Sequence, residues 1–285
     1  ACRELASTQV RKLSCSSYSI TLQHNPARAV SGSAAVDPES IRKRPCFLCT
    51  ANRPPEQQGM MYRDHYLILC NPMPIFNRHF TVVSLAHRPQ EIAFSVDALL
   101  QITFDAAPDY MVFYNGPACG ASAPDHLHFQ MIPSDALPFL NILADLAPIN
   151  QTSRVRVAAA KGFDRSVVVM QSSNAGALKK QFIHFLEIGK KVLSINDEPP
   201  VNVFCAYGKN SWRLTIFLRR KHRPDAYFAQ GDDRIFVSPG AIDMAGVVII
   251  PLIKNFEQLD CHAVQNIYSE VSLEEATLEQ IIGTL

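Results

Sequence analysis

The sequence predicts an α+β fold with antiparallel sheets. Segments with strand and helix patterns are mixed along the chain, without the regular alternation that a parallel sheet requires. The length of 285 residues suits two domains of about 150 residues or one duplicated domain. We expect two related halves, residues 1–155 and 156–285, with a polar junction at Asn150, Gln151, Thr152 and Ser153.

The elements of the first half follow from the spacing of apolar residues. Residues 1–13 have helical periodicity, and residues 18–23 alternate as in a strand. Residues 29–44 have the composition of a loop, and residues 45–58 hold a Cys-x-x-Cys knuckle. The remaining predicted elements are strands at 66–70, 80–85, 110–114 and 126–132, a helix within 89–106, and a small-residue loop at 115–125.

The second half uses the same kinds of element. Residues 177–193 are predicted as an amphipathic helix, because its apolar residues share one face and its lysines lie on the other. The other predicted elements are strands at 166–170, 201–207, 212–218, 234–237 and 247–250 and helices at 263–269 and 273–282.

The composition excludes several classes of protein. The 27 basic and 26 acidic side chains nearly cancel, which excludes a strongly basic surface for nucleic acid. With 9% aromatic residues, 12 Gly and 19 Pro, the chain is neither disordered nor collagen-like. The 8 cysteines are too sparse for a secreted disulfide scaffold, so we expect mostly reduced cysteines and a cytoplasmic location. Residues 1–13 lack the apolar region of a signal peptide, and prolines interrupt the nearly uncharged stretch 235–253, so no membrane partner is expected.

The most informative pattern is His126-x-His128-x-Gln130. Side chains alternate along a strand, so these three polar groups share one face. Burying three such polar side chains costs free energy unless they bind a ligand or form hydrogen bonds with each other or with other groups. The preceding loop has few large side chains, so its backbone N–H groups can cradle a phosphate. A neutral imidazole can attack phosphorus and form a covalent intermediate. The alternative is a pair of core histidines beside a glycine loop.

The run from Asn115 to Gln130 resembles the histidine triad superfamily. It is most similar to the branch of galactose-1-phosphate uridylyltransferase, diadenosine tetraphosphate phosphorylase and GDP-hexose (GDP-L-galactose) phosphorylase. The resemblance implies histidine-triad-like antiparallel sheets flanked by helices. Hydrolases of the superfamily usually carry a third histidine where Gln130 stands, so Gln130 favours transfer. Leu127 stands where the uridylyltransferases usually have proline, which favours the phosphorylases.

The resemblance also implies residue roles. His128 would attack the α-phosphate of a nucleotide, Gln130 would bind a phosphate oxygen, and His126 would be structural or bind a metal. Loop residues would hold phosphate or ribose, namely Asn115, Gly116, Gly120 and Ser122. The donor would be a nucleoside diphosphate sugar or a dinucleoside polyphosphate, and the acceptor phosphate or a sugar 1-phosphate. We expect no organic cofactor, and a homodimer is consistent with this interpretation of the sequence. The alternatives are a nucleotide hydrolase with the same nucleophile and a non-catalytic nucleotide-binding or zinc-stabilised protein.

A zinc site is a further expectation. Cys46 and Cys49 have the spacing of a metal knuckle, which is half of a site. In zinc-containing members of the superfamily, two histidines complete the site, and their counterparts are His87 and His126. A Cys₂His₂ set leaves no open position, so the zinc would be structural. His79 and His65 are alternative ligands, and two reduced cysteines packed under a loop are the alternative to any metal.

Two more segments are candidates for substrate binding. Basic residues follow the strand predicted at 212–218, and Arg219 and Lys221 are expected to contact phosphate. The alternative is a solvated charged loop. A proline-rich segment ends in Pro74, Ile75 and Phe76, which we expect to form an apolar base pocket, unless the segment only packs in the core.

Overall fold

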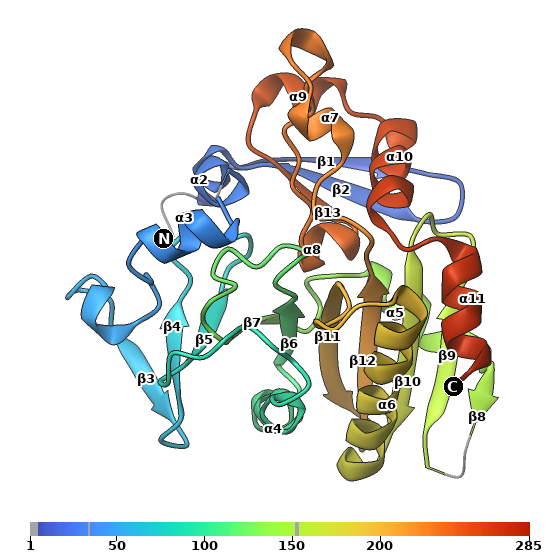
Figure 1. The fold of residues 1–285 in the computed structure, drawn as a ribbon. Helices are drawn as coiled ribbons and strands as arrows, with labels where there is room; N and C mark the ends of the chain where they lie inside the picture. Colours follow the sequence, from blue (N-terminus) through green and yellow to red (C-terminus); the bar gives the residue numbers. More distant parts are fainter. Residues whose placement is uncertain (1–4, 34, 152–153) are drawn as a thin grey trace.

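The computed structural model describes residues 5–33, 35–151 and 154–285. In these ranges the strands form one large and one small sheet (Figure 1). The large sheet has ten strands in the order β3-β4-β5-β7-β6-β11-β12-β10-β9-β8. They are β3 (Gly59–Tyr62), β4 (Tyr66–Cys70), β5 (Phe80–Ser84), β6 (Tyr110–Asn115), β7 (His128–Pro133), β8 (Asn150–Gln151), β9 (Arg156–Ala160), β10 (Ser166–Ser172), β11 (Val201–Gly208) and β12 (Ser211–Leu218).

Every pair in the large sheet is antiparallel, which confirms the predicted α+β class. The small sheet contains β1 (Gln9–Ser14), β2 (Ser19–His24) and β13 (Val247–Ile250). In it, β1 and β2 are antiparallel, whereas β13 runs parallel to β2. The small sheet therefore departs from the predicted antiparallel pattern.

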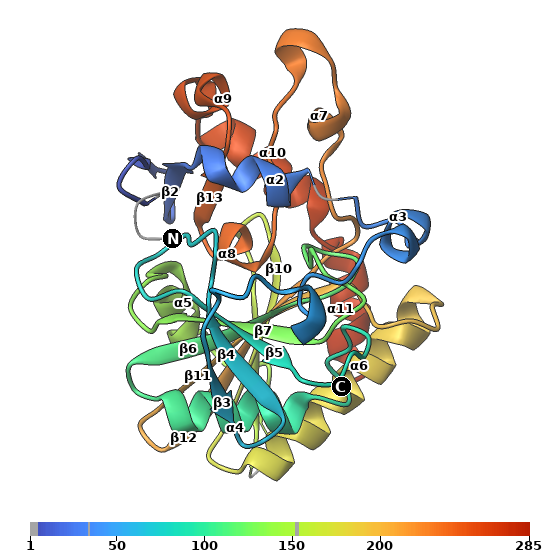
Figure 2. The same ribbon diagram turned by 90° about the vertical axis from the view of Figure 1, so that its left-hand side faces the viewer.

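Helices lie on both sides of the large sheet. The two longest on one side are α4 (Val96–Ala106) and α6 (Ala175–Leu193), and α11 (Glu275–Gly283) packs beside α6 (Figure 2). The small sheet and α10 (Cys261–Val271) cover the opposite face. The shorter helices are α2 (Ala29–Gly32), α3 (Pro38–Lys43), α5 (Phe139–Ile142), α7 (Asp225–Phe228), α8 (Ala241–Met244) and α9 (Ile253–Gln258), with 3₁₀ turns η1 (Pro26–Arg28), η2 (Thr50–Asn52), η3 (Leu143–Asp145) and η4 (Gly231–Asp233).

Strand alternation divides the core into two layers. In β6, Val112 and Tyr114 join the core under α4 and α6, whereas Met111 and Phe113 join the core under the small sheet. In β7, Phe129 packs toward the helices. His128 and Gln130 therefore point to the other side of the sheet.

The large sheet continues through both expected halves, because β6 of the first pairs with β11 of the second. The division at residue 155 stays a prediction. Thr152 and Ser153 of the expected junction lie outside the described residues, and β8 and β9 on either side of them pair with each other. Among the helices of the described ranges, none combines the length and apolar character needed to span a bilayer.

Three predicted segments are wrong. The helix expected at 1–13 is β1 from Gln9 onward, paired along its length with β2, while residues 1–4 lie outside the described ranges. The expected loop 29–44 contains α2 and α3, and Asp37 caps α3 by accepting from Ser40 N. Residues 234–237 form no strand, since the Phe236 N–H donates to the side chain of Asn255 instead. The strand expected at 126–132 is present as β7, with its bounds shifted to His128–Pro133.

The cysteines also differ from expectation in one pair. Cys15, after β1, and Cys261, at the start of α10, form a disulfide with an S–S distance of 2.13 Å. They are 246 residues apart in sequence, and no local sequence pattern predicts that they are in contact. Cys46, Cys49, Cys70, Cys119 and Cys205 carry free thiols.

Candidate functional site

A cavity of about 820 Å³ opens on the face of the large sheet that carries His128 and Gln130. Its floor comes from β5, β6 and β7, which supply Thr81, Phe113 and His128. Its walls come from segments far apart in sequence, near residues 28–36, 47–57, 69–75, 120–122, 222–223 and 236–243. The cavity volume is within the range of about 300–1,000 Å³ usual for small-molecule sites.

His128 is oriented by its own chain. Its Nδ1 lies 2.8 Å from the carbonyl oxygen of His126. A carbonyl oxygen can only accept, so Nδ1 carries the proton and Nε2 keeps its lone pair. The side chain is 5% exposed and lines the cavity, and burial lowers its pKa to about 4. His128 is therefore a neutral imidazole, and no described residue hydrogen-bonds its Nε2 atom.

A buried glutamine, Gln90, holds the strands apart beside His128. The last paired residues of β6 and β7 are Phe113 and Gln130. Beyond them, Gln90 Oε1 accepts from His128 N at 2.8 Å, and Gln90 Nε2 donates to His128 O at 3.0 Å and to Asn115 O at 2.9 Å. The carboxamide thus takes the place of the missing strand pairing between Asn115 and His128. We did not single out Gln90 in the sequence, where a lone glutamine after Arg88-Pro89 carries no distinctive signal.

The loop after β6 packs too closely for side chains at its glycines. A Cβ at Gly116 would lie 2.7 Å from the Val201 carbonyl oxygen. Gly120 has φ +118°, and a Cβ there would lie 2.8 Å from the Cα of Gly240. Gly120 and Ser122 line the cavity, whereas Gly116 lies outside its lining.

Asn115 lines the cavity and also ties this loop to the second half of the chain. Its Oδ1 accepts from Asn202 Nδ2 at 2.9 Å and from Ala241 N at 2.8 Å. The amide oxygen is therefore engaged by protein donors, so the Nδ2 group is the part of Asn115 that can bind a phosphate or ribose oxygen.

Cys46, Cys49, His87 and His126 form a cluster next to the cavity. One donor atom from each lies within 4.8 Å of all the others. His126 Nδ1 is 3.3 Å from Cys46 Sγ and 3.3 Å from His87 Nδ1, and Cys49 Sγ is 3.2 Å from His87 Nδ1. The structure thus brings together the four expected ligands, while the alternatives His79 and His65 lie outside the cluster.

The cluster has the composition and spacing for a tetrahedral metal ion. Bonds of about 2.3 Å to sulfur and 2.0–2.1 Å to nitrogen place a sulfur and a nitrogen ligand about 3.5 Å apart, and two nitrogens about 3.3 Å apart. The His126 Nε2–H donates to Ser84 O at 2.7 Å, which directs the Nδ1 lone pair into the cluster. The Cys46/Cys49/His87/His126 cluster can therefore bind a metal.

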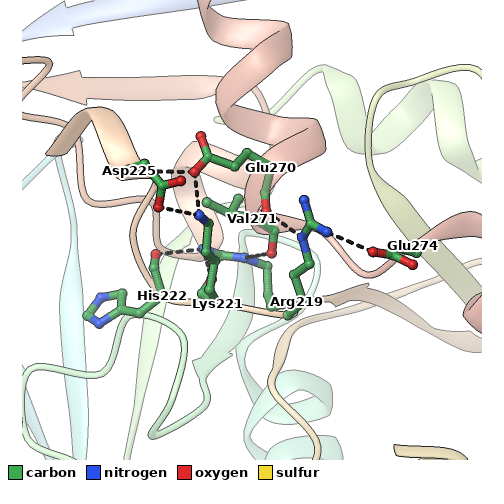
Figure 3. A network of polar contacts seen from close by, with 8 residues as sticks. Arg219, Lys221, His222, Asp225, Glu270, Val271 and Glu274 are labelled. Atoms are coloured by element: carbon green, nitrogen blue, oxygen red, sulfur yellow. Dashed lines mark hydrogen bonds and ion pairs between the residues drawn. The ribbon is translucent and has the colours of Figure 1, made fainter. Parts of the chain in front are cut away.

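The basic run after β12 serves mainly to join elements (Figure 3). Arg219 is 1% exposed and binds Asn202 Oδ1 at 2.8 Å, with further bonds to main-chain carbonyls. Lys221 pairs with Asp225 at 2.7 Å and with Glu270. Neither side chain lines the cavity, contrary to expectation. Figure 3 shows the His222 ring turned away from this network, and His222 lines the cavity.

Two other arginines, Arg28 and Arg223, line the cavity, together with the carboxylates of Glu56 and Asp243. Arg28 donates to Met73 O at 3.1 Å, and Arg223 donates to Ser238 Oγ at 3.0 Å. Asp243 lies in the same wall, where burial raises the pKa of its carboxyl to about 6. Arg28 is isolated in sequence, so no local pattern indicates that it lines a cavity. Arg223 belongs to the basic run, but the sequence does not show that its side chain lines the cavity while that of Lys221 does not.

One residue of the segment expected to form a base pocket lines the cavity, and another does not. Ile75 lines the cavity, together with Leu48, Met73 and Phe236. Phe76 packs at the edge of the core under the small sheet and does not line the cavity. The apolar wall expected near residue 76 is thus present, but it is built mainly from other side chains.

Comparison with known proteins agrees with this architecture. A family model described as a domain of unknown function (DUF4922) matches residues 1–133. No curated protein matches the sequence. Yeast Ap4A phosphorylase Apa2 has a similar structure, with a TM-score of 0.59 and 16% identity, over 93% of this chain and 87% of that chain. Its complex with Ap4A gives a TM-score of 0.57, 15% identity and coverage of 93% and 90%. Its complex with AMP gives a TM-score of 0.55 and 14% identity, over 93% of this chain and 88% of that chain. The chain thus shares its fold with yeast Ap4A phosphorylase Apa2.

Proposed function

We propose that this protein is a nucleotidyltransferase that works through a covalent nucleotidyl–histidine intermediate on His128. One observation carries the proposal. The His128 Nδ1–H is committed to the His126 carbonyl, and Nε2 faces the cavity beside Gln130 without a bond to any described residue. An imidazole held in this tautomer has its lone pair ready for attack without rearrangement.

In the first step, the Nε2 lone pair attacks the α-phosphorus of the bound nucleotide. A P–N bond forms, and the P–O bond to the leaving group breaks with its electron pair on oxygen. The leaving group is a sugar 1-phosphate or a nucleotide, both stable as anions, so departure requires no proton from the protein. Gln130 and the N–H groups of Gly120 and Ser122, two loop residues that line the cavity, stabilise the negative charge on the equatorial oxygens.

In the second step, an acceptor oxygen attacks the same phosphorus on the side opposite to nitrogen. The P–N bond breaks and returns its electron pair to His128 Nε2. With inorganic phosphate as acceptor the product is a nucleoside diphosphate, and with a sugar 1-phosphate it is a nucleotide sugar. Arg28 and Arg223 supply the positive potential that an anionic acceptor needs near an anionic intermediate.

The substrate class follows from the charge and shape of the cavity. Two arginines and a small-residue loop suit phosphates, and the apolar wall with Ile75 and Phe236 suits a base. The related yeast enzyme has been solved with Ap4A and with AMP. A nucleoside diphosphate sugar, including a GDP-hexose, or a dinucleoside polyphosphate is the proposed donor.

We assign a structural role to a zinc ion in the Cys46/Cys49/His87/His126 cluster. Four protein ligands would close the tetrahedron, so the ion would cross-link segments rather than take part in the reaction. The ring of His126 would then bind the metal, while its main-chain carbonyl oxygen accepts the hydrogen bond from His128 Nδ1. This arrangement would couple a rigid knuckle to the orientation of the nucleophile.

The test is incubation of the protein with GDP-hexose or Ap4A labelled in the α-phosphate. We expect an acid-labile label on the wild-type protein and none on His128→Asn. Added phosphate should release the label as nucleoside diphosphate. Release as monophosphate at the same rate with or without phosphate would instead establish a hydrolase. Binding of both nucleotides without any adduct would establish a non-catalytic nucleotide-binding protein.

A further inference from the structure

His79 is a buried histidine with a polar partner on each ring nitrogen. It is 3% exposed and precedes β5. Its Nδ1 lies 3.1 Å from the Ile75 main-chain nitrogen, and its Nε2 lies 2.7 Å from Gln130 Oε1. His79 belongs neither to the cavity lining nor to the metal cluster. Its position suggests that it acts on Gln130.

The contact with Ile75 decides which nitrogen of His79 carries the proton. A main-chain N–H can only donate, so Nδ1 must be the acceptor and Nε2 must hold the hydrogen. An imidazolium would set an N–H against the N–H of Ile75. Burial and the nearby charge of Arg28 lower the pKa of His79 to about 3, which agrees with a neutral ring. His79 therefore donates from Nε2 to Gln130 Oε1.

A second donor confirms the direction of the Gln130 carboxamide. Asn71 accepts from Met73 N at 3.0 Å through Oδ1, so its Nδ2 is the donor, and it lies 3.4 Å from Gln130 Oε1. The reversed carboxamide would place the Gln130 NH₂ group against two N–H donors. Only one orientation is satisfied, with the oxygen toward His79 and Asn71. The NH₂ group has no partner among the described residues, and Gln130 lines the cavity.

We propose that His79 is a positioning residue that fixes Gln130 as a hydrogen-bond donor to the substrate. The relay runs from the Ile75 N–H through the His79 ring to the Gln130 oxygen and leaves the Gln130 NH₂ group in the cavity. Such a group binds an anionic phosphate oxygen. Because its own oxygen is occupied, Gln130 cannot accept a proton from a water molecule. This inference deepens the proposed function and relies on it for the identity of the bound anion.

The relay has a signature that does not depend on activity. ¹⁵N NMR of the labelled protein distinguishes protonated from unprotonated ring nitrogens, and His79→Gln assigns the signals. At neutral pH we expect a proton on Nε2 and none on Nδ1 of His79. A proton on Nδ1, or on both nitrogens, would overturn the inference. If the wild type forms no adduct with any nucleotide, the proposed function fails, while this measurement still decides the relay.

Kinetics provide the second readout, as the single-turnover rate of adduct formation. We expect His79→Leu and Gln130→Leu each to lower this rate, by roughly 10- to 100-fold for His79, the size seen when partners that orient a ligand are removed. The double variant should be within about 3-fold of the slower single variant, because both changes remove one interaction. Independent, multiplying losses would contradict the relay.

Two matched variants guard against a merely structural effect. In His79→Gln, the new Nε2 can still donate to Gln130, so most of the rate should return. His65→Leu changes an exposed histidine in the turn before β4 and should leave the rate unchanged. If His79→Gln is as slow as His79→Leu although both fold, orientation of Gln130 is not the role of His79.

Discussion

The carboxamide of Gln90 binds both the N–H and the C=O of His128, at 2.8 and 3.0 Å. Two strands that would otherwise pair through Asn115 and His128 are separated by this side chain, which also binds Asn115 O. The proposed nucleophile is therefore held by one buried side chain from the segment between β5 and α4. Its position depends on contacts that are remote in sequence.

Replacing Gln90 by leucine should destabilise the fold. The change leaves the N–H and C=O of His128 and the C=O of Asn115 without their partner, and each unpaired buried group costs about 1–3 kcal/mol. We expect the free energy of unfolding to fall by at least ~3 kcal/mol in urea titrations. Gln101→Leu, on the outer side of α4, should stay within ~0.5 kcal/mol of wild type. Equal stability of Gln90→Leu and wild type would show that water replaces the carboxamide.

Removal of the proposed zinc ion should lower the thermal stability of the protein. We expect about one zinc per chain in the purified protein and a clear drop in Tm after treatment with a chelator, because an ion bound only by the folded state stabilises it. Cys46→Ser should lose the zinc, and Cys70→Ser, at an exposed free thiol, should keep it. A full complement of zinc in Cys46→Ser would place the ion elsewhere.

The cavity arginines and the basic run should differ in their effect on binding. Arg223→Ala removes a charged donor from the cavity and should weaken nucleotide binding roughly 10-fold or more. Lys221→Ala breaks ion pairs with Asp225 and Glu270 and should leave binding unchanged. Calorimetric titration of Ap4A into the His128→Asn background measures both without turnover. A loss confined to Lys221→Ala would reverse the assignment.

Glu198 should make stability depend on pH. Burial raises the pKa of its carboxyl to about 7, while it accepts hydrogen bonds from Ile92 N and the Tyr114 hydroxyl. The folded state therefore holds a proton that the unfolded chain releases above about pH 4.5, so this contribution is present at low pH and is lost as pH rises toward 7. The loss amounts to at most ~3 kcal/mol.

Glu198→Gln cannot lose this proton and is the matched variant. Relative to wild type, it should gain stability between pH 5 and pH 8 in urea titrations. Comparing the two proteins at each pH removes the contributions of all other titrating groups. A constant difference across this range would mean that Glu198 keeps an ordinary pKa in the fold.

The local patterns of the sequence predicted the parts of the structure that are decided locally. The alternation around Phe129 predicted which face of β7 carries His128 and Gln130, and the amphipathic spacing predicted α6. The strand β1 was mistaken for a helix because its pairing with β2 decides its conformation. At a strand end, one residue reverses the direction of a side chain, so Lys221 and Arg223 could not be told apart.

Contacts between distant segments were beyond local patterns. Gln90, Arg28 and His79 obtain their roles from the residues that the fold brings beside them. The Cys15–Cys261 disulfide joins residues 246 positions apart, so local sequence patterns could not predict it either. The Cys46/Cys49/His87/His126 cluster could be predicted from local patterns only in part. Its Cys-x-x-Cys half is visible in the sequence, whereas His87 and His126 were expected only through the resemblance to zinc-containing members of the superfamily.

During turnover, Nε2 of His128 should become covalently bonded to a nucleotide. Intact-mass and peptide-mapping mass spectrometry of the protein, quenched at neutral or alkaline pH after incubation with GDP-hexose or Ap4A, tests it most directly. We predict a mass increase of one nucleoside monophosphoryl group, located on the peptide that contains His128 and absent from His128→Asn. An adduct that persists in His128→Asn, or turnover with no adduct in a rapid quench, would contradict it.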